Sequence, residues 1–102
     1  MTKLSTQEER IMLVLWKLGN CTVAQIIDLY NDPKPSQNTI ATFMGILEKK
    51  NYVRHRRIGR SYEYSAIVSK FDYSQFLLGQ ILLNYFDSDK SKMKIGVDFL
   101  DL

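Results

Sequence analysis

The sequence has little of several residue types, and each shortage excludes a class of protein. Its 102 residues include one cysteine, Cys21, and one histidine, His55. This inventory excludes a disulfide framework and a Cys/His zinc site, and a lone thiol is typical of a reducing compartment. The longest apolar run, residues 76–83, is interrupted by Gly79 and Gln80, and the first ten residues lack the apolar stretch of a signal peptide. We therefore expect a small cytoplasmic protein without a leader or a membrane span.

Residues suited to catalysis are also scarce. The single histidine lies in an arginine-rich segment, where neighbouring positive charge disfavours the charged imidazole. Glu8 and Glu9 stand where a helix is expected to begin, and acidic residues are usual at that position. Because no nucleophile has a base beside it, we expect no enzyme, no cofactor, no bound metal and no small-molecule substrate.

What is present suffices for one folded domain with a local excess of positive charge. The chain is 45% hydrophobic and 12% aromatic, which is enough for a core. Residues 49–60 contain no acid and carry +6 against a total of +3, so the remaining residues sum to −3. The basic residues are Lys49, Lys50, Arg54, Arg56, Arg57 and Arg60. Such a segment on a nearly neutral body predicts a docking surface for a polyanion, most often nucleic acid.

Three helices are predicted in the first half of the chain. Ser5 with Glu8, and Thr22 with Gln25, have the capping-box spacing that begins a helix. Two prolines within residues 33–35 force a turn. Ser36 then caps a third helix, which is expected to run to about residue 50.

A β-hairpin is predicted next, because residues 52–57 and 62–66 alternate on both sides of a turn that contains Gly59. Tyr62 and Tyr64 share one face and are expected to pack on the third helix, while Glu63 faces an arginine across the hairpin. Residues 21–23 could add a short third strand. The predicted fold is mostly α with a small β-wing: a winged helix-turn-helix domain over residues 1–68.

Residues 69–102 differ, because apolar side chains cover nearly the whole circumference of a fourth helix. Such a helix, followed by a shorter amphipathic one, predicts a dimer interface. The alternative is that the fourth helix folds back on its own core. The residues assigned to dimerisation are Phe71, Phe76, Leu78, Ile81, Leu82, Tyr85, Phe86, Val97 and Leu100.

The side chains on the exposed face of the third helix are short, polar and uncharged, whereas the exposed face of an ordinary helix carries many charged residues. Gln37 and Asn38 can each pair with adenine in a DNA major groove, and Thr39 or Ala41 can contact a thymine methyl. Arg57 and Arg60 at the hairpin tip, with the other basic residues of 49–60, are expected on the DNA backbone or in the minor groove. The alternative is a winged-helix module that binds proteins and not DNA.

Several short segments together resemble the penicillinase repressor family (BlaI/MecI/CopY type) over residues 4–68. They are Leu4-Ser5, Ile11-Met12, Leu15-Trp16, Thr22-Val23, residues 38–44, residues 47–50 and residues 59–64. The resemblance implies a cytoplasmic, nucleoid-associated repressor that dimerises through C-terminal helices on a dyad-symmetric operator. It also implies that Ser36, Gln37, Asn38, Thr39 and Thr42 face the major groove.

The sequence departs from that family at three points. Ala41 stands where the family often has Lys or Arg, so the operator is expected to differ. The clustered C-terminal cysteines of the copper-responsive branch are absent, which argues against copper sensing. The β-lactam branch is switched by proteolysis at an Asn-Phe step; its nearest equivalent is Asp98-Phe99, so a membrane sensor-protease is a candidate partner.

Overall fold

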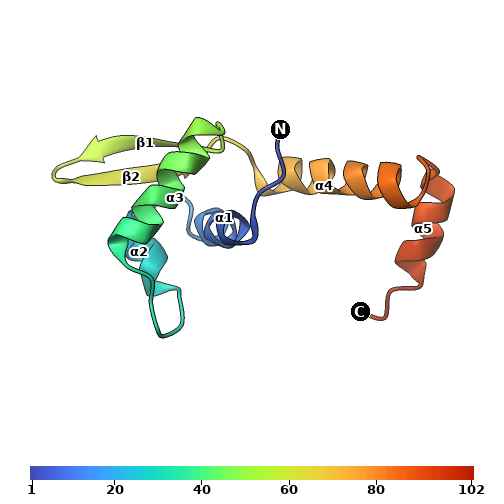
Figure 1. The fold of residues 1–102 in the computed structure, drawn as a ribbon, viewed down its shortest axis with the longest axis horizontal. Helices are drawn as coiled ribbons and strands as arrows, with labels where there is room; N and C mark the ends of the chain where they lie inside the picture. The colour runs from blue at the N-terminus through green and yellow to red at the C-terminus, as the bar shows by residue number, and fades with distance from the viewer. The chain divides into compact units, whose positions relative to one another are not determined.

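The computed structural model describes residues 1–102, which divide into two compact units, Met1–Lys70 and Phe71–Leu102. The first unit contains three helices and a hairpin, and Figure 1 shows the hairpin projecting beyond the helices. These elements are α1 (Thr6–Leu18), α2 (Val23–Asp28), α3 (Gln37–Lys49), β1 (Val53–Ile58) and β2 (Ser61–Ala66). Two further helices, α4 (Lys70–Tyr85) and α5 (Lys90–Asp98), follow.

The predicted helix starts are confirmed. At α1 the Glu8 amide donates to Ser5 Oγ at 3.2 Å, and the Ser5 amide donates to Glu8 Oε1 at 2.8 Å. Thr22 and Gln25 make the same reciprocal pair at the start of α2. Both pairs satisfy backbone donors that would otherwise lack partners.

The end of α2 is held by a contact that the sequence did not suggest. The Lys34 ammonium, beyond the two-proline turn, donates to the carbonyl oxygens of Ile27, Asp28 and Tyr30 at 3.3, 3.2 and 2.6 Å. A cation on the last carbonyls of a helix satisfies their lone pairs and opposes the negative end of the helix dipole.

The hairpin is antiparallel and joins the helical body through one bridge. Its register pairs His55 with Tyr64 and Arg57 with Tyr62. Cys21 bridges Tyr64, with Cys21 N to Tyr64 O at 3.0 Å and Tyr64 N to Cys21 O at 2.8 Å. The expected third strand is therefore a single bridge, because Thr22 already caps α2. The element order and this small sheet confirm the winged helix-turn-helix prediction.

The core of the first unit lies between α1, α2, α3 and the base of the hairpin. The largest fully buried side chains are Ile11, Met12, Leu15, Cys21, Ile26, Ile40, Met44, Leu47, Tyr52 and Val53. Trp16 is half-buried, and its indole Nε1 donates to the Val68 carbonyl at 2.9 Å. This bond fixes the segment that leaves the hairpin.

The second unit leaves most of its large apolar side chains exposed. An apolar groove of about 270 Å³ lies between α4 and α5; a Cβ added at Gly96 would approach the Phe86 ring at 3.0 Å. The groove is lined by Leu78, Ile81, Phe86, Met93, Gly96, Val97 and Leu100. None of the helices combines the length and apolar character that crossing a lipid bilayer requires.

Candidate nucleic-acid interface

The outer face of α3 offers two amide side chains with unused hydrogen-bonding capacity. Ile40, Met44 and Leu47 point into the core, and the residues predicted to read bases are all exposed. The amides of Gln37 and Asn38 make no hydrogen bond within the chain, and an amide offers both a donor and an acceptor.

The three hydroxyl groups on this helix already have partners within it. Ser36 Oγ accepts from the Thr39 amide at 3.1 Å and lies 2.9 Å from Thr39 Oγ1. Thr42 Oγ1 donates to the Asn38 carbonyl at 2.8 Å. The methyl groups of Thr39 and Thr42 and the remaining lone pairs of the three hydroxyl groups are still available, but the amides are the groups with full capacity.

The hairpin register divides its arginines between two faces. Directly opposed residues of an antiparallel pair share a face, and neighbours along a strand alternate. Arg57 therefore shares a face with His55, Tyr62 and Tyr64, whereas Arg54 and Arg56 lie on the other face. The +6 segment is not one continuous cluster of charge.

Two of its six cations are already paired. Lys50 Nζ contacts both oxygens of Glu8 on α1, at 2.8 and 2.9 Å. Arg56 Nη2 lies 3.0 Å from Glu63 Oε1, which is the cross-strand pairing expected for Glu63. That all six bind DNA stays a prediction; the four without an ion pair, Lys49, Arg54, Arg57 and Arg60, are the better candidates.

The Glu8–Lys50 pair has a structural role. Glu8 is 3% exposed. Burial by itself raises the pKa of Glu8, but the hydrogen bonds from Lys50 and Ser5, with the charge of Lys50, together hold it below its ordinary value. The pair fastens the C-terminal end of α3 to α1 and so fixes the direction of the helix.

A groove of about 250 Å³ lies between the outer face of α3 and the tip of the hairpin. Gln37 and Ala41 line it from α3, and Arg60, Ser61, Tyr62 and Tyr64 line it from the wing; the start of α2 adds Thr22, Val23 and Ala24. Gln37 on the outer face of α3 and Arg60 at the wing tip therefore line one concave surface.

Tyr62 is a site residue that the sequence analysis missed. Alternation assigned Tyr62 and Tyr64 to the side facing the helix, and the groove confirms that side. Tyr62 is nevertheless 48% exposed, and it shares the lining of the groove with the small Ala41 of α3. Tyr64 is half-buried, and burial, followed by the nearby Glu48 and Tyr62, raises its pKa.

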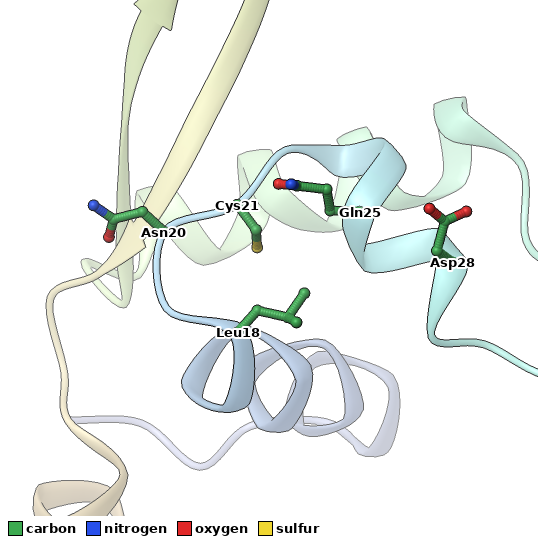
Figure 2. Close-up of a pocket in the computed structure, with 5 residues that line it drawn as sticks. All are labelled: Leu18, Asn20, Cys21, Gln25 and Asp28. Atoms are coloured by element: carbon green, nitrogen blue, oxygen red, sulfur yellow. The ribbon is translucent and has the colours of Figure 1, made fainter.

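A second cavity, also about 250 Å³, lies where α1 ends and α2 begins. Figure 2 shows the residues that line it, Leu18, Asn20, Cys21, Gln25 and Asp28. Burial, with a smaller effect of Glu63, raises the pKa of the Cys21 thiol to about 11, so the thiol stays protonated at neutral pH. Cys21 is 1% exposed and packs as a small apolar residue, so the cavity offers no reactive thiolate.

Comparison with known proteins shows which sequences and structures this chain resembles. An uncharacterized 16.5 kDa protein from the ptsI 3' region of Latilactobacillus sakei is 31% identical over 71 residues, which are 69% of this chain and 49% of that protein. The chain thus spans about half the length of this curated relative. The solution structure of the DNA-binding domain of the repressor BlaI matches with a TM-score of 0.60 and 30% identity, over 72% of this chain and 94% of that one. The penicillinase repressor family model matches residues 4–95. The chain belongs to the penicillinase repressor family.

Proposed function

We propose that this protein is a dimeric transcriptional repressor that reads a dyad-symmetric DNA operator with α3 and contacts the DNA backbone or minor groove with its wing. One observation carries the proposal: the unused amide of Gln37 lines the same groove as Arg60 at the hairpin tip, and the unused amide of Asn38 is exposed at the next position of α3. Residues 1–68 bind the DNA, and residues 69–102 associate two chains. As a repressor acts on the chromosome, the protein works in the cytoplasm.

Base recognition follows from the side chains on α3. The amides of Gln37 and Asn38 can each make two hydrogen bonds to adenine, and each such pair discriminates by about 1–3 kcal/mol. The Ala41 methyl suits a thymine methyl, and a longer cation there would fill the groove. Ser36, Thr39 and Thr42 hold the first turns of the helix and present small surfaces to the bases.

Affinity comes mainly from phosphate contacts. Arg57 and Arg60 at the wing tip, with Lys49 and Arg54, are exposed cations that can release counterions from DNA. For a dimer, we expect the logarithm of affinity to fall with the logarithm of salt concentration with a slope steeper than about −4.

Self-association is assigned to α4 and α5, whose exposed apolar side chains suit a second copy. Two copies on one face of the duplex need half-sites about one helical turn apart, or a multiple of it. Repression then requires only that the dimer blocks the polymerase. Phe99 is 84% exposed directly after α5, so its side chain is accessible for recognition by a protease, such as a membrane sensor-protease.

Selection of duplexes from a random library tests the proposal. We expect an inverted repeat to be enriched, and Asn38→Ala to lose about 5- to 100-fold in affinity for it with a much smaller loss on an unrelated duplex. Arg60→Ala is expected to weaken both duplexes alike and to reduce the salt slope by about one per subunit. Arg56→Ala is the matched control, with a smaller effect because Glu63 already pairs with Arg56.

Two outcomes contradict the proposal. A salt slope near zero on the enriched duplex would remove its electrostatic part. Failure to enrich any sequence, together with no shift of an unrelated duplex at low salt, would favour the alternative of a protein-interaction module.

A further inference from the structure

A side-chain pair joins the recognition helix to the wing. His55 Nδ1, in the middle of β1, is in hydrogen-bond contact with Glu48 Oε1 near the end of α3. The two side chains are 38% and 39% exposed. The contact is an ion pair when the imidazole is protonated.

The same imidazole ring supports one wall of the groove. Its centroid lies 4.9 Å from that of Tyr62, in an edge-to-face arrangement, and 5.6 Å from that of Tyr64. Both tyrosines line the groove opposite Gln37 and Ala41. His55 therefore connects an acid on α3 to the wing residues that face the amide surface.

The charged and titratable groups around His55 come from three elements. Glu48 reaches it from α3, the Tyr62 and Tyr64 rings from β2, and Arg57 shares its face of β1. Arg54 and Arg56 are its neighbours along the strand but lie on the opposite face. Among these groups Glu48 is the one carboxylate.

We propose that Glu48 and His55 are positioning residues for DNA recognition, and that their contact holds the wing at the angle that lets α3 and the wing tip bind one duplex together. The inference rests on the proposed function. When α3 lies in the major groove and the wing tip reaches the adjacent backbone, the angle between them must match the duplex. A wing that is free to move loses affinity, because ordering it costs conformational entropy on binding.

For Glu48→Gln, this proposal and an argument from net charge alone predict opposite changes in the affinity for DNA. Removing a carboxylate from a DNA-binding surface reduces repulsion of phosphates and, on charge alone, strengthens binding. Loss of the positioning contact weakens it instead. Glu63→Gln is the matched control. It also removes one carboxylate, but Glu63 is on the hairpin face opposite to His55 and pairs with Arg56 instead.

The experiment measures affinity of the full chain for the enriched duplex and for an unrelated duplex of equal length. We expect Glu48→Gln to bind the enriched duplex roughly two- to fivefold more weakly than wild type, the range set by an exposed ion pair. Glu63→Gln is expected to bind both duplexes as tightly as wild type or more tightly. Equal strengthening by both variants would overturn the inference.

A double variant separates positioning from charge. The double variant Glu48→Gln/His55→Gln is expected to bind no more weakly than either single variant; additive losses would contradict a shared contact.

The failure of this inference is distinguishable from failure of the proposed function. If wild type enriches no duplex, the function itself is wrong. If wild type enriches a duplex but Glu48→Gln binds it as tightly as wild type or more tightly, only the positioning role is wrong. A measurement without DNA supports the distinction: in ¹⁵N relaxation, the β1 and β2 amides are expected to be more mobile in Glu48→Gln than in Glu63→Gln.

Discussion

The two units of this chain use similar apolar side chains in different ways. In the first unit Leu47 of α3 is completely buried, whereas in the second unit Leu83 of α4 is 64% exposed. The apolar residues of α3 form one stripe, and those of α4 surround the helix. A helix with one apolar stripe can be covered by its own domain, but a helix that is apolar all round requires a further surface.

The units also differ in how many of their side chains are buried and in whether a buried charge is among them. The first unit buries a carboxylate, Glu8, and fastens it to Lys50 across 42 positions of sequence. Tyr73 is the one buried residue within α4, and α5 has none. The comparison indicates that the first unit is stabilised from within, and that the second is suited to stabilisation by association.

The largest expected effect tests the internal core. Leu47→Ala is expected to lower the free energy of unfolding by about 2–5 kcal/mol, because it removes a packed side chain and leaves a cavity. Urea denaturation followed by Trp16 fluorescence measures it. For Leu83→Ala, with unfolding followed by far-ultraviolet circular dichroism, which reports the helices of both units, we expect a change within about 0.5 kcal/mol. Equal losses in the two variants would remove the distinction between the units.

The next effect tests association through the second unit. Ile81 lines the apolar groove between α4 and α5, and Ile81→Lys is expected to weaken self-association by about a hundredfold, because it places a charge in an apolar interface. Sedimentation velocity measures the change. Gln80→Lys adds the same charge at a polar position of α4 and is expected to remain associated. A wild-type chain that sediments as a monomer would contradict the proposed dimer.

The smallest effect concerns the buried charge. Glu8→Gln is expected to cost about 1–2 kcal/mol of unfolding free energy at neutral pH, since Lys50 loses its partner but can still reach water. The pKa of Glu8 lies below its ordinary value of 4.5 in the folded chain. Its contribution is therefore complete above about pH 4.5 and is lost as the pH falls through the lower, folded value.

Urea denaturation at a series of acid pH values measures this dependence. The difference in stability between wild type and Glu8→Gln is expected to shrink as the pH is lowered. Glu9→Gln is the control, because Glu9 makes no ion pair. A difference between wild type and Glu8→Gln that is independent of pH would mean that the lost interaction is not ionic.

The sequence by itself determined the features that depend on near neighbours. Ser5 with Glu8 and Thr22 with Gln25 begin helices because their partners are three residues away, and alternation fixed which hairpin residues share a face. The amide face of α3 followed in the same way from helical spacing.

Only the tertiary structure decided which charges are free and which surfaces meet. Nothing in the local pattern distinguishes Lys50, paired with Glu8, from the unpaired Lys49 beside it. The exposure of Tyr62 beside Ala41 and the contact of His55 with Glu48 likewise depend on how the hairpin packs on α3. These contacts join residues on different elements, and their geometry is set by the packing of those elements, which no local spacing specifies.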